Sequence, residues 1–229
     1  MPKTIVVVGY GPGISTAVAE KFGVEGFSVA LVARNAASLA GGVAALQAKG
    51  VVAAGFQGDA ANPASMSEAI GKARDALGPI TVLHWNAISG SQSGDLMAID
   101  PTGVGGIFDV AIVGLLSAVH KVLPDLKSTA EGAVLVTNGA FGFNVPAMDA
   151  LAVSLKAMGV ALANAAKAKL VGLLSERLRA DGVYVGEVTV AGAVKGTPYA
   201  ADGGIEGAKI ADQFWALYQA RNEIRATVS

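Results

Sequence analysis

The sequence predicts an α/β protein, a single doubly wound domain built around a mostly parallel sheet of six or seven strands. Three observations lead to this fold class. Short β-branched segments alternate with longer helical segments along the whole chain, which is the pattern of successive β–α–β units. The first strand runs through a glycine-rich turn into a helix. Finally, the 229 residues are 52% hydrophobic and only 15% charged, which suits a sheet covered on both faces.

The first half of the chain provides four of the expected strands. Apolar, largely β-branched runs at residues 5–8, 28–33, 51–56 and 81–85 are typical of buried parallel strands. Helices are expected between them, from Ala17 onward, over 36–49 and over 66–77. Gly50 ends the second of these helices, Pro63 opens the third, and Gly78-Pro79 stops it.

The second half continues the alternation. A loop rich in Ser, Gly and Asp at 89–103 leads to an apolar helix over 104–126 and a strand over 133–137. A long helical region over 148–179 ends before Gly182 and the strand at 183–190. A glycine-rich loop at 192–204, an amphipathic helix over 205–219 and a short strand over 224–228 follow. No repeat or linker divides the chain, so we expect residues 1–229 to form one domain.

The composition argues against several classes of function. A net charge of −1 without basic runs argues against a nucleic-acid partner. Asp109 interrupts the longest apolar stretch, so no membrane span is expected. Without cysteine, and with two histidines, the chain offers neither disulfides nor an expected metal site. The N-terminus leads directly into a strand, so we expect no signal peptide and a cytoplasmic location.

The turn after the first strand has the chemistry of a phosphate-binding loop. Glycines lack a Cβ, so the backbone can approach a pyrophosphate, and the free N–H groups of the following helix face it. The spacing G-x-G-x-x-G fails at its third position, whereas G-x-x-x-G-x-G fits with a serine in last place. We therefore expect a Rossmann-type fold with a dinucleotide held by Gly9, Gly11, Gly13, Ile14 and Ser15.

Arg34 follows the second expected strand, where the adenosine ribose of a dinucleotide would lie. An acidic residue there would bond the ribose hydroxyls of NAD, whereas a guanidinium clamps the 2′-phosphate of NADP with two parallel hydrogen bonds. We predict that NADP is preferred over NAD. The alternative is an exposed arginine that binds no ligand.

The turn spacing resembles that of the short-chain dehydrogenase/reductase family. Asn86-Ala87, after the fourth strand, also matches the middle of the family's N-N-A-G segment. The resemblance covers nearly the whole chain and implies a nicotinamide cofactor, a small-molecule substrate and hydride transfer. It places Asp59 and Ala60 at the adenine, Asn86, Ala87 and Thr197 on the nicotinamide side, and Lys167 at the nicotinamide ribose.

The family's reaction centre, a Ser, a Tyr and a Lys with an Asn on the preceding helix, is incomplete in this sequence. The serine position falls on Gly139, or on Asn138 after a slip of one residue. The tyrosine position falls on Ala163 and the asparagine position on Ala111, so only Lys167 remains. A second register ends in a lysine at position 156 and also begins with alanine.

Three side chains are candidates to replace the missing groups. Lys167 can act through a water, since desolvation lowers an ammonium's pKa. Asn138 can orient a carbonyl, and Tyr199 lies in the loop after the sixth strand. Aromatic residues are expected to border an apolar pocket beside the nicotinamide, namely Trp85, Phe141 and Phe143.

Two functions follow from this pattern. The first is a short-chain-type, NADP-dependent oxidoreductase with an altered active site, acting on a small carbonyl, alcohol or enone. The alternative is a non-catalytic NADP-binding sensor or subunit, with a non-redox use of the pocket as a third class. In the family, the helices expected at 104–126 and 160–178 form a dimer face, so we predict a homodimer or homotetramer. Otherwise both helices are simply buried against the sheet.

Overall fold

Seven strands form one parallel sheet in the computed structural model, which describes residues 3–89, 94–198, 200 and 203–229. The order across the sheet is β3-β2-β1-β4-β5-β6-β7, and the neighbouring strands pair in parallel. The strands are β1 (Lys3–Val8), β2 (Phe27–Ala33), β3 (Ala53–Gln57), β4 (Ile80–Trp85), β5 (Ala133–Gly139), β6 (Tyr184–Val190) and β7 (Arg225–Val228). The predicted α/β fold class is confirmed, with seven strands.

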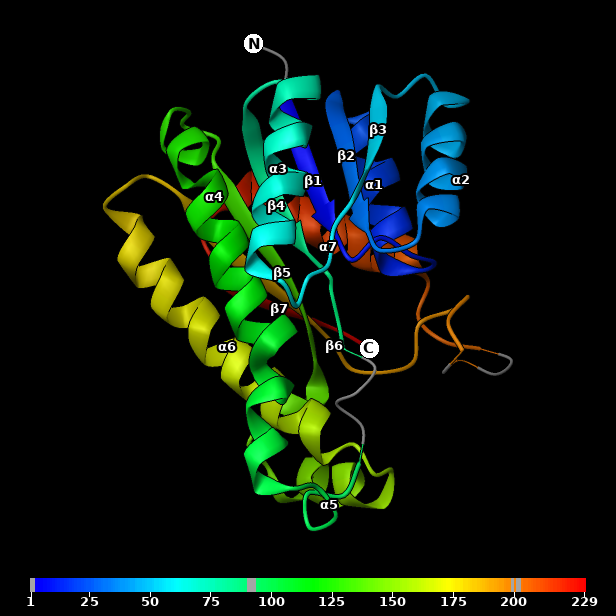
Figure 1. Ribbon diagram of the computed structural model, residues 1–229, viewed down its shortest axis with the longest axis vertical. Coiled ribbons are helices and arrows are strands. Elements are labelled where there is room, and N and C mark those ends of the chain that lie inside the picture. Colours follow the sequence, from blue (N-terminus) through cyan, green and yellow to red (C-terminus); the bar gives the residue numbers. More distant parts are fainter. Residues whose placement is uncertain (1–2, 90–93, 199, 201–202) are drawn as a thin grey trace.

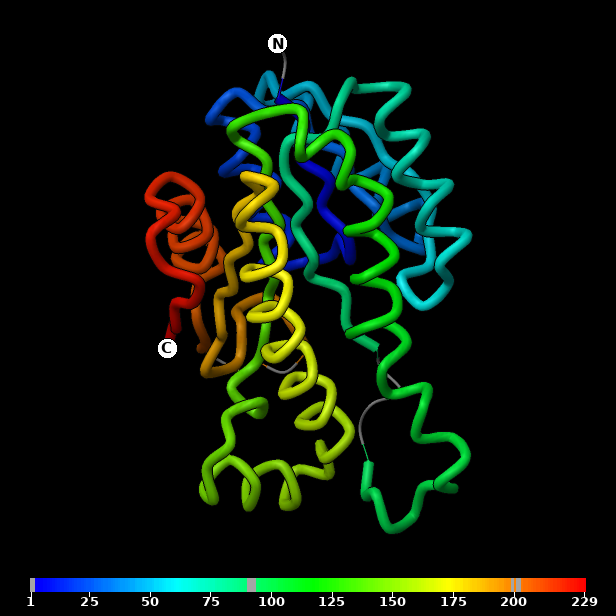
Figure 2. Tube along the Cα trace, turned by 90° about the vertical axis from the view of Figure 1, so that its left-hand side faces the viewer, coloured from blue at the N-terminus to red at the C-terminus, as the bar shows by residue number. Residues whose placement is uncertain are grey.

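Helices cover both faces of the sheet (Figure 1). One face carries α3, α4 and α6, and the other carries α1, α2 and α7, as the edge-on view shows for α6 and α7 (Figure 2). The helices are α1 (Ile14–Val24), α2 (Ala36–Gln47), α3 (Pro63–Leu77), α4 (Leu115–Lys127), α5 (Pro146–Ser154), α6 (Met158–Arg179) and α7 (Gly207–Ala220).

The strands are mostly apolar because the helices on the two faces of the sheet enclose two hydrophobic cores. Val6 and Val8 of β1 pack in the core beneath α3, α4 and α6. Ile5 and Val7 point to the opposite face and pack in the core beneath α1, α2 and α7, which includes Phe214. Because successive strand residues face opposite cores, a central strand has no solvent-facing side, and its sequence is mostly apolar.

The predicted helix over 104–126 was wrong in its first half. A 3₁₀ segment (Pro101–Ile107) and a π-helical segment (Asp109–Gly114) precede α4. Glycines within the first segment weaken a regular helix. The second segment ends at Gly114, where a Cβ would collide with the carbonyl oxygen of Ala60, so the chain passes in close contact with the loop after β3.

The helical region predicted over 148–179 is also divided. Helix α5 ends at Ser154 and α6 begins at Met158. Between them Lys156 adopts a left-handed backbone with φ 51°, which an α-helix cannot contain. At the end of the chain, the helix predicted over 205–219 begins at Gly207, because Ile205 instead forms a β-bridge with Val194.

Two helical stretches, Pro101–Lys127 and Met158–Arg179, are long and apolar enough to cross a membrane when judged by length and composition alone. The core helix of a soluble protein passes the same test. Each stretch packs one side against the sheet, through side chains that include Val122 and Val171. The expected absence of a membrane span stays a prediction.

Candidate functional site

The predicted site residues lie around the edge of the sheet at which the parallel strands end. The first strand starts near the N-terminus at the top of Figure 1, and α5 lies at the opposite, lower end of the molecule. The strand order reverses between β1 and β4. In open α/β sheets, ligands bind outside the carboxyl ends of the strands at such a reversal.

The glycine turn approaches two other segments closely. Gly9 has φ 82°, and a Cβ there would lie 2.5 Å from the backbone of Ala87 after β4. Gly13 has φ 85°, and a Cβ there would lie 3.1 Å from Val194 and 3.2 Å from Thr197. The structure therefore brings together the turn, the end of β4 and the loop after β6.

The Ser15 side chain closes the glycine turn, whereas α1 starts after Gly13 without a side-chain cap. Ser15 is buried, and its Oγ accepts from Gly11 N at 2.9 Å and donates to Gly11 O at 2.8 Å, so this hydroxyl closes the turn. Helix α1 begins at Ile14, and its N-cap, Gly13, provides no side-chain hydrogen bond. The first N–H groups of a helix have no intrahelical partner, so this end of α1 is open to an anion.

On the adenosine side, Arg34 is exposed after β2, and its carbonyl accepts from Gln57 Nε2 at 3.2 Å. No ion pair holds its guanidinium within the described part of the chain. Asp59 follows β3, and its Oδ1 accepts from Ala61 N at 3.0 Å. The carboxylate of Asp59 thus forms a local turn around Ala60.

Two polar residues expected near the nicotinamide hold the loops of the site together. Asn86 Nδ2 lies 3.5 Å from Gly9 O, which links the end of β4 to the glycine turn. Thr197 Oγ1 donates to Val194 O at 2.7 Å, so this hydroxyl stabilises its own turn. The methyl group of Thr197 faces Gly13.

Lys167 is a buried lysine on the side of α6 that faces the sheet, with 6% of its surface exposed. Burial lowers the pKa of Lys167 to about 8, and the negative charge of Glu187 opposes this effect. Lys156, the lysine of the second register, is exposed in the turn before α6. The two candidate lysines thus differ in burial, and the register that contains Lys167 stays a prediction.

The positions corresponding to the family's other three groups lie close to one another. Ala163 and Ala111 are buried in one small apolar cluster with Ile107. Gly139, at the end of β5, faces α6, where a Cβ would come within 2.6 Å of Asn164 Nδ2. An amide from α6 thus occupies the space beside Gly139.

The remaining sequence candidates have different positions. Asn138 is buried, and its Nδ2 donates to Asn164 O at 3.0 Å while its Oδ1 accepts from Gly139 N at 3.0 Å, so its amide fixes β5 to α6. The prediction that Trp85 borders a pocket was wrong, because Trp85 is fully buried in the core beneath α3 and α4. Tyr199 lies outside the described residues. Phe143 is exposed, and its place beside a pocket stays a prediction.

Two polar residues at this end of α6 and β6 were not predicted. Asn164 is a buried amide within an alanine-rich run, and Glu187 is a buried acid within a valine-rich strand. In both cases the signal was a single polar residue in an apolar context. Such residues are seldom fully buried without a partner.

Comparison with known proteins identifies the family. The family model described as short chain dehydrogenase matches residues 3–197. The peroxisomal 2,4-dienoyl-CoA reductase of Arabidopsis thaliana is 27% identical over 142 residues, which are 62% of this chain and 47% of that protein. The ketoacyl reductase HetN of a Nostoc strain is 25% identical over 173 residues, 74% of this chain and 59% of that protein. The chain thus spans about half the length of these relatives.

Solved structures with the same fold cover almost the entire chain. A metagenomic short-chain oxidoreductase in complex with NADP is 23% identical with a TM-score of 0.80, over 99% of this chain and 96% of that one. An NADPH-bound short-chain oxidoreductase from Pseudomonas aeruginosa PAO1, described as containing an atypical catalytic center, is 18% identical with a TM-score of 0.84, over 99% and 95%. With the family model matched over residues 3–197, the chain belongs to the short-chain dehydrogenase family.

Proposed function

We propose that this chain is an NADP-dependent oxidoreductase with an altered reaction centre, which transfers hydride to or from a small carbonyl, alcohol or enone. The observation that carries the proposal is a buried lysine on α6, which lies one helical turn after Ala163 and has no ion-pair partner among the described residues. It is the group that a hydride-transfer site of this family retains here, beside positions occupied by Gly139 and Ala163.

The residues of the turn fit a dinucleotide. The backbone conformation of Gly9 and Gly13 suits glycine, and α1 starts without a side-chain cap, so a pyrophosphate would find open N–H donors. The exposed guanidinium of Arg34 would hold the 2′-phosphate of NADP. Asp59 and Ala60 would border the adenine, and Asn86, Ala87 and Thr197 the nicotinamide side.

The chemistry at the reaction centre would depend on Lys167. The cofactor, when bound, supplies or accepts the hydride. The Lys167 ammonium would bond the nicotinamide ribose, and a pKa of about 8 also allows it to release a proton through a water near neutral pH. Among these substrates, an enone depends least on a tyrosine as proton donor, because water can protonate an enolate carbon.

A second function, NADP binding without catalysis, is favoured by the same three substituted positions. A general acid contributes roughly 10²–10⁴ in rate, and neither Gly139, Ala163 nor Ala111 supplies one. The protein from Pseudomonas aeruginosa combines bound NADPH with an atypical catalytic center, which is a precedent for a changed centre on this fold.

Two measurements test the proposal. NADPH fluorescence should rise and saturate when the protein is added; without saturation, neither NADP-dependent function holds. Consumption of NADPH should then be followed over a panel of carbonyls and enones. Turnover that Lys167→Ala abolishes and that Lys169→Ala, a change at an exposed lysine of the same helix, preserves would support the oxidoreductase. Binding without turnover on any substrate would support the sensor or subunit.

The cofactor preference has its own test. Arg34→Ala should weaken binding of NADPH by about ten- to a hundredfold, because a charge-assisted bidentate contact is lost, and should leave NADH almost unaffected. Arg34→Lys keeps the charge and loses the planar fork, so it should give an intermediate loss. Equal losses for both nucleotides would refute the phosphate-binding role of Arg34.

A further inference from the structure

The side-chain amide of Asn164 is an interior polar group that the proposed chemistry leaves unused. Asn164 lies on the buried side of α6, directly after Ala163, with 6% of its surface exposed. Its backbone oxygen accepts from Asn138 Nδ2 at 3.0 Å, but its side chain makes no hydrogen bond within the part of the chain that the structure describes. An amide is rarely left without a partner at this degree of burial, so its N–H groups are available to a ligand.

The amide of Asn138, the other buried asparagine among the described residues, is already engaged. Asn138 lies in β5, and its Nδ2 donates to the backbone oxygen of Asn164. Its Oδ1 accepts from Gly139 N at 3.0 Å. The side chain that the sequence predicts as the group that orients a carbonyl therefore joins β5 to α6, and it leaves the amide of Asn164 as the candidate for this role.

The amide of Asn164 is directed at the end of β5. A Cβ on Gly139 would lie 2.6 Å from Asn164 Nδ2, so the amide nitrogen fills space that a side chain at position 139 would need. A Cβ on Gly142 would lie 2.8 Å from the backbone carbonyl carbon of Asn164. Two glycines thus make room for this asparagine. Residues 139–142 are themselves only partly buried, so the end of the strand can be reached from outside.

We propose that Asn164 is a catalytic residue whose amide N–H donates to the carbonyl oxygen of the substrate at the end of β5. The inference rests on the proposed function, in which Gly139 stands at the position that the sequence predicts for the family's serine. When hydride from the cofactor adds to a ketone carbon, the electron pair of the C=O bond moves to this oxygen, which then takes a proton from water. The amide holds the oxygen during this change and is itself unaltered.

The first test observes the amide itself. In protein labelled with ¹⁵N-asparagine and supplied with NADP⁺, which has no hydride to transfer, the NH₂ signals of Asn164 are assigned by their loss in Asn164→Ala. Cyclohexanone and cyclohex-2-enone are the probes. Both should shift these signals in a saturable way, because the N–H gains an acceptor. The signals of Asn222, an exposed asparagine after α7, should stay. Unshifted Asn164 signals with both probes overturn the proposal.

Turnover provides the second test. Asn164→Ala should lower kcat for carbonyl reduction by about 10²–10³, the usual effect of removing one donor to a developing oxyanion, and should leave NADPH binding unchanged. The double variant Gly139→Ser/Asn164→Ala returns a donor to this strand end, so it should recover part of the lost rate. Asn222→Ala is the matched control and should keep full turnover. Full turnover in Asn164→Ala overturns the proposal.

The two tests also separate this inference from the proposed function. NADPH binding with unshifted Asn164 signals refutes the role of Asn164 alone. A saturable shift of these signals in protein that does not bind NADPH refutes the proposed function alone. If Asn164→Ala does not fold, Asn164→Ser serves for the assignment, and because its hydroxyl is a donor it should lose less turnover than a variant without one.

Discussion

The side chain of Asn164 occupies the space beside Gly139, the position that the sequence predicts for the family's serine. A Cβ on Gly139 would already lie 2.6 Å from Asn164 Nδ2, which is closer than non-bonded atoms approach. The backbone oxygen of Asn164 also accepts from Asn138 at 3.0 Å, which fixes this part of α6 against the end of β5. A side chain at position 139 and the amide of Asn164 would therefore compete for the same space.

Restoring the serine should consequently destabilise the protein. Gly139→Ser should lower the free energy of unfolding by about 1–3 kcal/mol, the usual cost of overpacking a filled interior. In the double variant Gly139→Ser/Asn164→Ala most of this loss should disappear. Urea unfolding of the two single variants and the double variant gives the coupling between the positions. Additive effects would show that the amide does not occupy the serine's space.

His84 determines part of the pH dependence of stability. It is fully buried in β4, its Nε2 lies 3.1 Å from Thr137 Oγ1, and its ring packs edge-on against Phe214. Burial lowers the pKa of His84 to about 3, below the value of 6.5 for an exposed histidine. Between these values the unfolded chain binds one more proton than the folded protein, so stability falls as the pH falls.

The expected loss is measurable under mild conditions. Between about pH 7 and 5, wild type should lose about 2 kcal/mol of unfolding free energy through His84. His84→Gln removes the titrating group and should lose about 2 kcal/mol less over the same interval. Denaturant unfolding at both pH values checks this, and equal losses in the two proteins would exclude His84 as the source.

At the residue level, the sequence was sufficient where chemistry is local. The positive backbone angles at Gly9 and Gly13 agree with the spacing of a phosphate turn. The role of Lys167, which lies within α6, stays a prediction. Glu187 and Asn164 could not be assigned roles in this way. Their partners, Arg225 and Gly139, lie far away in the chain and meet them only in the folded protein.

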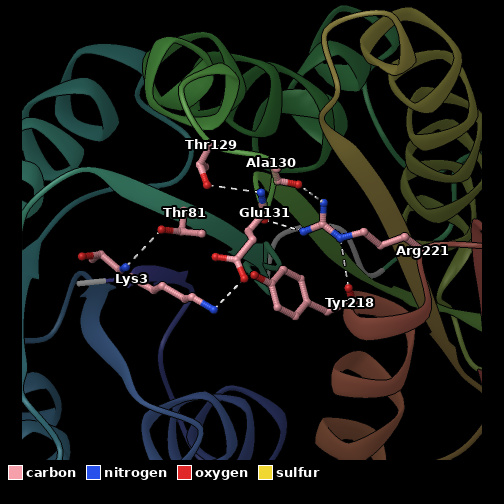
Figure 3. Close-up of polar contacts among 8 residues, drawn as sticks. Lys3, Thr81, Thr129, Ala130, Glu131, Tyr218 and Arg221 are labelled. Carbon is pink, nitrogen blue, oxygen red and sulfur yellow. Dashed lines mark hydrogen bonds and ion pairs between the residues drawn. The ribbon is translucent and has the colours of Figure 1, made fainter. Parts of the chain in front are cut away.

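At the level of elements, the end of α7 shows how one residue attaches a helix to the sheet. Arg221 terminates α7 in a left-handed conformation, φ 51°. Its guanidinium donates to the carbonyls of Ala130 and Glu131 before β5 and to Tyr218 of its own helix (Figure 3). Glu131 in turn pairs with Lys3 of β1 at 2.6 Å. This cluster joins α7, β5 and β1 at the amino edge of the sheet.

Two substitutions separate the contributions of Arg221. Both Arg221→Ala and Arg221→Gly lose the guanidinium's hydrogen bonds to the backbone. Alanine keeps the strain of a left-handed residue, whereas glycine adopts this conformation freely. Arg221→Ala should therefore be about 1 kcal/mol less stable than Arg221→Gly, which should itself be less stable than wild type. Chemical unfolding measures the order, and a more stable alanine variant would contradict this account.

The strands were predictable as elements because their apolar runs are bounded by glycine and proline. The helices near the site were less predictable, since their breaks depend on contacts between distant segments. Gly114 ends the π-helical segment where the backbone of Ala60 passes too closely for any side chain. The apolar composition that predicts a helix over 104–126 carries no information about this contact, so the change of helix type at Gly114 could not be predicted from it.

At the scale of the whole molecule, the alternation of strands and helices was enough to predict a mostly parallel sheet, because a helix between two strands is the pattern of β–α–β units. The association of several copies of the chain depends instead on its outer surface. The outer sides of the π-helical segment, which continues into α4, and of α6 expose apolar side chains, among them Val113, Leu162 and Leu173. These side chains face away from the core that accounts for the inner sides of the same helices. We therefore expect this surface to be covered by a second copy of the chain.

A charge placed in this surface should prevent association. Leu173, on α6, is 57% exposed, and Leu173→Glu would bury a carboxylate in any contact made through α6. Wild type should elute as a dimer or tetramer in size-exclusion chromatography with light scattering, and Leu173→Glu should shift to the monomer mass. Val24, on α1, is 73% exposed, so Val24→Glu is the matched control and should leave the assembly intact. A monomeric wild type, or dissociation by the control alone, would show that α6 does not form the contact.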